Sequence, residues 1–512
     1  MKYIIGALKQ VALAIFLLSF LASCGNRAAE ESPAEREATP TPLPAPLHSP
    51  ATPEPVYTLP AASELSTHIF DNTHIFDDCT SNHETAICLT CASTLITMMG
   101  EIFDRDDGAM WGTHLRKPFM FACPVTRFAV ASQQDLHNHL ERQADSVYVG
   151  ILPEAVWIGN TVTEAFGELW GMVTVSYAQS IMPDVNRVVG IMIHELFHAW
   201  QPELFAGERY TGSFFIPIAE IDARVQIMVE ITALLHALAS YGEERIQAIH
   251  VALSAREARR QQNPGVSYRE NSGEIHEGTA VYTELRFVTE DFTEQVRWLN
   301  NYVDTHFRDS SLFIFGYATG ALYGLLLDAL DVNWRIGLNW NTDLGALLRE
   351  AAGMHTLTPF DEIDMSPFGY DEIRATEIAW VARYERHLAD AKRIFAQPTL
   401  FVPRGGELSL NYDNINLLFL PARQQGMNYV VYFGDLIFEH AFGRIVISNG
   451  HMMLHRAHVI SSDGSNVTFF NEITAYDMIF DEYGASTAYW TLQLNPGYRI
   501  VRRDGNYQIR GA

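Results

Sequence analysis

Residues 191–200, Ile191-Met192-Ile193-His194-Glu195-Leu196-Phe197-His198-Ala199-Trp200, carry the pattern His-Glu-x-x-His inside an apolar stretch. Residues four apart lie on one face of a helix, so His194 and His198 can direct two imidazole nitrogens at a single ion. Glu195 lies beside them, within reach of a water molecule on that ion. The stretch therefore predicts a helix with two metal-ligating histidines and a carboxylate that can take a proton from water.

The residues that precede the motif favour a helix. Asp184 can cap its first turn, and Val188, Met192 and Leu196 recur at helical spacing. Gly190 leaves room one turn before His194. The alternative to a metal-binding helix is a structural helix whose two histidines find partners inside the protein.

Two histidines do not hold a zinc ion alone, so a third protein ligand is needed. The short form His-Glu-x-x-His-x-x-Gly-x-x-His is excluded, because Gln201 and Leu204 occupy the positions of its Gly and last His. The third ligand is therefore expected from a later segment, and a carboxylate on a later helix is the leading candidate.

The later stretch Gly273-Glu274-Ile275-His276-Glu277-Gly278-Thr279-Ala280 supplies such a carboxylate. Together with His194 to His198, it resembles gluzincin-type zinc metallopeptidases, whose third ligand is a Glu on a downstream helix, often within Asn-Glu-Gly-Phe/Leu-Ala. The resemblance implies a zincin-like fold and zinc (Zn2+) as the cofactor, with Glu277 as the third ligand. It also implies that Gly278 and Ala280 let the two helices approach closely.

The chain departs from this family pattern at several points. The gap between His198 and Glu277 is longer than in the best-known members, His276 replaces the usual Asn, and Val281 stands where some relatives have an Asp that orients a histidine. Glu274 and Glu230 therefore remain alternatives to Glu277, either as the ligand or as partners of a ligand histidine.

Gluzincins often use a tyrosine hydroxyl from a later segment to stabilise the oxyanion. The resemblance implies Tyr317 for this role, in the stretch Phe315-Gly316-Tyr317-Ala318-Thr319-Gly320 that precedes a predicted helix. Tyr282 and His276 are alternatives, and a tyrosine buried in the core is the structural interpretation of any of these side chains.

These residues predict a zinc-dependent hydrolase, in particular a peptidase acting on a peptide or protein substrate. His194, His198 and Glu277 are the expected ligands, with Glu195 as the catalytic base. The alternative is a catalytically inactive, metallopeptidase-like surface lipoprotein that acts as a binding module. The formal charge of −26 argues against a nucleic-acid partner.

The N-terminus resembles that of a bacterial lipoprotein. Residues 1–23 have lysines followed by an apolar run, and Leu21-Ala22-Ser23-Cys24 resembles a lipobox. The resemblance implies that Cys24 is lipidated and tethers the chain to a bacterial membrane, outside the cytoplasm. Residues 24–60 contain many prolines and cannot bury a core, so they predict an extended tether.

The remaining cysteines, Cys79, Cys88, Cys91 and Cys123, all lie in the first part of the folded chain. An even number outside the cytoplasm favours two disulfides, with three possible pairings. The Cys-x-x-Cys spacing of Cys88 and Cys91 alone is a weak zinc or redox signal.

The hydrophobic periodicity predicts an α+β chain: an α-rich, zincin-like catalytic domain at 61–396, with a Cys-containing N-terminal part at 61–145, and a separate all-β module at 397–512. A small N-terminal sheet is expected from strands at 147–151, 155–158 and 172–175. Helices are expected at 219–240, 243–262, 271–290, 293–307, 317–330, 344–352 and 371–396. In the β module, predicted to be a sandwich or an open barrel, Asn449-Gly450 and Asp504-Gly505 predict hairpin turns.

Overall fold

The computed structural model describes residues 89–511 apart from short gaps, of which the longest are 209–219 and 421–428. The predictions for residues 1–88, which include the signal peptide, the tether, Cys24, Cys79 and Cys88, lie outside the described residues. Within the described part, no helix is both long enough and apolar enough to cross a membrane.

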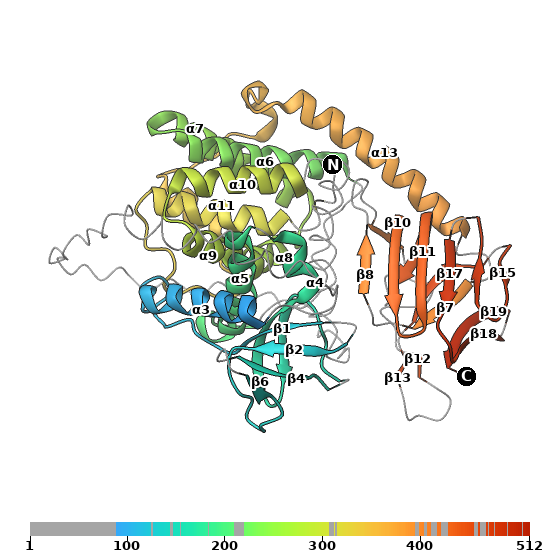
Figure 1. Ribbon diagram of the computed structural model, residues 1–512. Coiled ribbons are helices and arrows are strands. Elements are labelled where there is room, and N and C mark those ends of the chain that lie inside the picture. The colour runs from blue at the N-terminus through green and yellow to red at the C-terminus, as the bar shows by residue number, and fades with distance from the viewer. Residues whose placement is uncertain are drawn as a thin grey trace.

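The chain is mixed α+β, as the periodicity predicts (Figure 1). A small sheet and a set of helices form the first part, and α13 leads from them to the C-terminal strands. The last helical residues of α13 precede the first strand of this second part by a few residues, so the change of period near residue 397 coincides with a change of secondary structure.

The small sheet has the strand order β3-β4-β2-β1-β6-β5. Its strands β1 and β6 run parallel, and the other neighbouring pairs are antiparallel. The bounds are β1 Phe119–Ala122, β2 Phe128–Ala131, β3 Glu141–Arg142, β4 Tyr148–Ile151, β5 Thr161–Ala165 and β6 Glu168–Thr174. The strand predicted at 155–158 is wrong, because its described residues form turns and irregular backbone after Pro153.

Both faces of this sheet are covered. Alternate residues of β1 point to opposite faces, so Phe119 and Phe121 join the main core while Met120 and Ala122 join a smaller core on the other side. On the main face, α5 (Val185–Leu204) packs directly on β6: a Cβ added to Gly171 would lie 3.0 Å from the Cα of Leu196. The sheet therefore supports the backbone of the His-Glu-x-x-His turn.

The helices after this motif lie within a few residues of their predicted positions. Their bounds are α6 Ile221–Ala239, α7 Gly242–Gln262, α8 Val266–Gly273, α9 Thr279–Val288, α10 Phe292–His306, α11 Phe315–Ala329, α12 Leu344–Ala351 and α13 Tyr370–Ile394. Two earlier helices, α3 (Leu89–Asp106) and the short α4 (Val175–Ile181), were not expected. The helix predicted at 271–290 is interrupted: a π-helical turn, η2 (Glu274–Gly278), joins α8 to α9.

The helices η2 and α11 touch through their backbones. A Cβ added to Gly278 would lie 2.4 Å from the Cα of Gly320, and one added to Gly320 would lie 2.7 Å from the carbonyl oxygen of Glu274. Glycine at both positions permits this close approach. Glu277 on η2 and Tyr317 on α11 are thereby held next to each other.

In the C-terminal part, most of the described strands form one hydrogen-bonded sheet, in the order β15-β16-β17-β11-β14-β7-β19-β18, with β10 pairing β11, β8 and β9. A separate pair is formed by β12 and β13. The bounds are β7 Thr399–Pro403, β8 Glu407–Leu410, β9 Leu417–Leu420, β10 Tyr429–His440, β11 Gly443–Leu454, β12 Val459–Ile460, β13 Val467–Thr468, β14 Phe470–Thr474, β15 Ile479–Phe480, β16 Gly484–Ser486, β17 Trp490–Leu494, β18 Tyr498–Arg503 and β19 Asn506–Gly511.

One of the two predicted hairpin turns is wrong. The hairpin predicted at Asp504-Gly505 is confirmed by the antiparallel pairing of β18 and β19, in which Arg503 pairs with Asn506, while Asp504 itself lies outside the described residues. Asn449-Gly450 instead lies inside the continuous strand β11, where the register with β10 shifts opposite Gly434 to Leu436. The dipeptide therefore accommodates an irregularity in a long strand pair rather than reversing the chain.

The prediction of two disulfides is also wrong. Cys123 is a free cysteine, buried immediately after β1, where its side chain packs as part of the main core. Cys91 is disulfide-bonded. Because Cys123 is free, the partner of Cys91 lies outside the described residues.

Candidate metal centre

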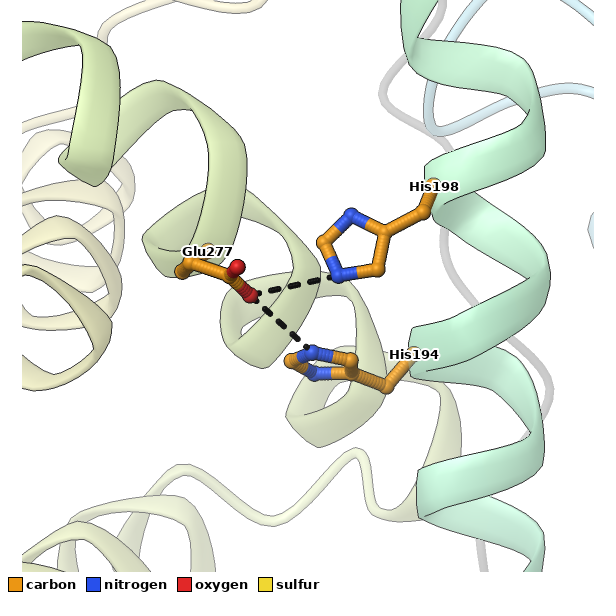
Figure 2. Close-up of side chains that lie close together, drawn as sticks. All are labelled: His194, His198 and Glu277. Atoms are coloured by element: carbon orange, nitrogen blue, oxygen red, sulfur yellow. Dashed lines mark ion pairs between the residues drawn. The ribbon is translucent and has the colours of Figure 1, made fainter. Parts of the chain in front are cut away.

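Helix α5 places His194 and His198 on the face that looks toward η2 (Figure 2). Asp184 caps this helix as predicted, accepting a hydrogen bond from the backbone N–H of Arg187. The two rings lie edge to face with centroids 4.8 Å apart. His194 is buried and His198 is partly buried, so both imidazoles meet the opposite helix with little solvent around them.

Glu277 completes a group of three potential ligands. Its Oε2 lies 3.5 Å from Nε2 of His194 and 3.2 Å from Nε2 of His198 (Figure 2). One ligand atom from each residue lies within 4.8 Å of the other two, so the group could hold a metal ion. Glu277 stands on the π-helical turn, a local departure from α-helix that is frequent at functional sites.

These separations suit a small divalent cation. Two ligand atoms at about 2.0–2.1 Å from zinc, at a tetrahedral angle, lie about 3.3 Å apart. The distances of 3.2 and 3.5 Å from Glu277 to the two imidazoles bracket this value. Two imidazole nitrogens and a carboxylate oxygen are also a donor set that zinc accepts in hydrolytic sites.

The opposite nitrogen of each ring faces an oxygen. Nδ1 of His194 lies 3.4 Å from Oε2 of Glu284, and Nδ1 of His198 lies 2.9 Å from Oε1 of Gln201. A neutral imidazole carries one proton, and a proton on Nδ1 satisfies these oxygens. Both Nε2 atoms then present lone pairs toward Glu277.

The site attracts positive charge. Burial by itself would lower the pKa of His194, but Glu277 and Glu284 outweigh this effect and raise the pKa to about 10. Burial would likewise raise the pKa of Glu277, but His276 and His198 hold it well below its usual value. Three acidic side chains of the site, counting Glu195, thus surround the two histidines.

Glu195 is placed beside the candidate ligands without being one of the three. It is buried, and its pKa is raised to about 8: burial is the largest cause, Glu277 and Glu284 also raise the pKa, and His194 partly offsets them. A carboxylate with a pKa near neutrality is well suited to accept and return a proton.

Tyr317 is part of the site. Its ring stacks on that of His194, with centroids 6.2 Å apart and planes within 5° of parallel. Burial, followed by the Glu277 carboxylate, raises the pKa of Tyr317 well above its usual value, so the hydroxyl stays protonated and can donate a hydrogen bond. Tyr282, the alternative, instead donates to Asp328 on α11.

His276, the other alternative, also lies at the site. Its Nε2 is 3.4 Å from Oε1 of Glu277, and its ring centroid lies 4.3 Å from that of His198.

Glu274 and Glu230 do not face the histidines. Arg256 donates to both oxygens of Glu274 at 2.7 Å, and Thr319 also donates to this carboxylate. Glu230 pairs with Arg256 and Arg259, and accepts from Tyr323. Both alternatives therefore belong to a buried ion-pair network that braces the helices around η2.

Glu270 on α8 is part of the same network. It accepts hydrogen bonds from Arg259 and Arg260 at 2.7 and 2.8 Å. Burial would raise its pKa, but the arginines, Arg259 first, outweigh burial and lower the pKa from 4.5 to about 2.

We expect Glu270→Gln to destabilise the protein at neutral pH, by about 3 kcal/mol from the pKa difference alone. A lowered carboxyl pKa stabilises the fold above its unfolded value of 4.5, and this contribution disappears as pH falls toward about 2. Denaturant unfolding at pH 7 and at pH 3 measures it: the gap between wild type and variant should shrink at pH 3. A constant gap would show that the charge of Glu270 contributes nothing.

Glu284 is a residue of the site that the sequence did not reveal. It lies on α9, seven residues after Glu277, and its Oε2 is 3.4 Å from Nδ1 of His194. Gly190 is the sequence feature that could have indicated this contact, because the room it leaves one turn before His194 is filled by the Glu284 carboxylate. A Cβ added to Gly190 would lie 2.9 Å from Oε1 of Glu284.

We expect Glu284→Gln to lower the metal affinity by about 10- to 100-fold, because a charged partner of a ligand imidazole orients the ring and raises its basicity. Competition with a chromophoric chelator measures this. Glu257→Gln, an exposed change on α7, is the matched control. An affinity equal in the two variants would rule out this role for Glu284.

Comparison with protein-family models, curated proteins and solved structures found no match to this chain.

Proposed function

We propose that this protein is a gluzincin-type zinc metallopeptidase that cleaves a peptide or protein substrate outside the cytoplasm, held at a bacterial membrane by a lipid on Cys24. The site residues proposed are His194, His198 and Glu277 for the metal, with Glu195 and Tyr317 for catalysis. The location is inferred from residues 1–60 of the sequence, which lie outside the described part.

One observation carries the proposal: three electron-pair donors converge on one buried point. The Nδ1 atoms of His194 and His198 face Glu284 and Gln201, so their Nε2 lone pairs meet Oε2 of Glu277. Nε2 lone pairs that face a carboxylate oxygen at 3.2–3.5 Å need positive charge between them. When no metal is bound, protons on the imidazoles supply that charge, which fits the raised pKa of His194.

The donor set favours zinc over harder cations. Mg²⁺ and Ca²⁺ prefer oxygen ligands, whereas imidazole suits zinc and its neighbours among the transition metals. When bound, zinc supplies Lewis-acid chemistry that makes water a nucleophile near neutral pH.

The chain's own residues supply the remaining chemistry. Glu195 takes the proton of the attacking water as the new C–O bond forms, and returns it to the leaving amine as the C–N bond breaks. The Tyr317 hydroxyl, kept protonated, can donate a hydrogen bond to the oxygen of the scissile carbonyl as charge develops there.

The test is turnover of a peptide library by the full chain, with and without a chelator. The proposal predicts cleavage that the chelator abolishes and added zinc restores. Stoichiometric zinc binding without chelator-sensitive cleavage would contradict a peptidase and would favour a binding protein on the same scaffold.

A further inference from the structure

Gln201 lies on α5, in the turn that follows His198, and its side chain is fully buried against η2. The amide nitrogen lies 3.3 Å from the carbonyl oxygen of Ile275 and 2.5 Å from that of His276. It also lies 3.2 Å from the hydroxyl of Thr279. One side of the amide therefore joins the ligand helix to the π-helical turn that carries Glu277.

These contacts fix which way the amide points. Backbone carbonyl oxygens only accept hydrogen bonds, so the NH₂ group of Gln201 must face Ile275 and His276. The amide oxygen then faces the opposite side, where it lies 2.9 Å from Nδ1 of His198 and 2.7 Å from Nδ1 of His276.

The orientation of the amide also fixes the tautomers of two histidines. An amide oxygen cannot donate, so both Nδ1 atoms must carry protons. The Nε2 of His198 is left with its lone pair directed at Oε2 of Glu277, 3.2 Å away. The Nε2 of His276 is held 3.4 Å from the other oxygen of Glu277.

We propose that Gln201 is a positioning residue of the metal centre, whose amide oxygen holds His198 in the tautomer and orientation that a metal ligand needs, and aligns His276 beside Glu277. The inference rests on the proposed zinc site. It adds that the two ligand histidines are held differently, His194 by the carboxylate of Glu284 and His198 by a neutral amide. The amide oxygen of Gln201 contacts the Nδ1 atoms of two imidazoles at once, those of His198 and His276.

The test compares Gln201→Leu with Gln226→Leu in the full chain. Gln226 is a buried glutamine of α6 that lies outside the group His194, His198 and Glu277, so it controls for placing leucine in the interior. Zinc affinity is measured by chelator competition, and the visible spectrum of the cobalt(II)-substituted protein reports the ligand geometry. We expect Gln201→Leu to bind zinc about 10- to 100-fold more weakly and to change the cobalt spectrum, with Gln226→Leu within about twofold of wild type.

A second variant separates the oxygen's role from the structural link. Gln201→Glu keeps an acceptor oxygen facing the imidazoles, but it replaces the NH₂ donor with an oxygen that meets the carbonyl oxygens of Ile275 and His276, and it adds negative charge. A charged acceptor holds the Nδ1 protons at least as strongly as the amide oxygen, so we expect an affinity no more than about threefold weaker than that of wild type. If Gln201→Leu fails to fold, the zinc affinity of Gln201→Glu still tests whether the acceptor oxygen at this position holds His198. A loss as large as that expected for leucine would show that the link to η2, and not the tautomer, is what matters, and would overturn the inference.

The outcomes distinguish this inference from the proposed function. If the wild-type chain binds zinc and Gln201→Leu has the same zinc affinity and the same cobalt spectrum, the inference alone is overturned. A wild-type chain that binds no zinc overturns the proposed function, and the inference with it.

Discussion

Glu195→Gln is expected to lower the rate of peptide hydrolysis by about 10²- to 10⁴-fold while the protein keeps its zinc. The glutamine has the same shape as the glutamate but cannot take a proton from water or return it to the leaving amine. Glu195 lies outside the group of three potential ligands, so the metal affinity should change little. Single-turnover cleavage rates and zinc content, measured on the same preparations, test both halves of the expectation.

The matched control is Glu203→Gln. Glu203 is on the same helix but exposed, where it pairs with Lys117. This variant should cleave at the wild-type rate. If Glu195→Gln also cleaves at that rate, another group accepts the proton and the proposed role of Glu195 is wrong.

His194→Ala is expected to lose zinc and, with it, chelator-sensitive cleavage. Removing a ligand should weaken binding more than the roughly 10- to 100-fold loss typical when only a ligand's partner is changed. The change also leaves two buried carboxylates, Glu277 and Glu284, without the imidazole between them. Zinc content after dialysis and a chelator-competition titration measure the loss.

Two comparisons make this result specific. His236→Ala removes a histidine of α6 that is about 40% exposed and pairs with Glu244, so it should keep the wild-type affinity. Thermal unfolding of the metal-free proteins shows whether His194→Ala still folds. A folded His194→Ala protein that binds zinc as tightly as wild type would place the metal elsewhere.

Much of the helical part could be predicted from local sequence. Apolar spacing located α6, α7 and α10 to α13 within a few residues, and Asp184 marked the start of α5. The three residues His194, His198 and Glu277, which lie far apart in the sequence, come together in the structure. The motif identifies the first two, whereas Glu277 was chosen over Glu274 and Glu230 because residues 273–280 resemble a gluzincin segment. Gly278 was expected to bring this helix close to the His-Glu-x-x-His helix, but it meets Gly320 of α11 instead.

Other features depend on contacts that the sequence does not display. The π-helical turn of η2 arises where Gly278 meets Gly320 and Arg256 holds Glu274, which are tertiary contacts. Nothing in the local pattern near Glu284 or Gln201 distinguishes them from ordinary helix residues, and only the packing of α5 on η2 and α9 gives them partners.

In the sheets, local signals were less reliable. Asn449-Gly450 has the sequence of a tight turn, yet pairing with β10 keeps it within a strand. The strands β1 and β2, of four residues each, are too short to show a period of their own, and their pairing with each other and with β6 defines them.

The most direct test of the proposed zinc site is a crystal of the full chain with zinc, measured at the zinc absorption edge. We expect one anomalous peak within about 2.0–2.2 Å of Nε2 of His194, Nε2 of His198 and a carboxylate oxygen of Glu277. A zinc-loaded crystal whose anomalous peaks all lie away from these three side chains would contradict it.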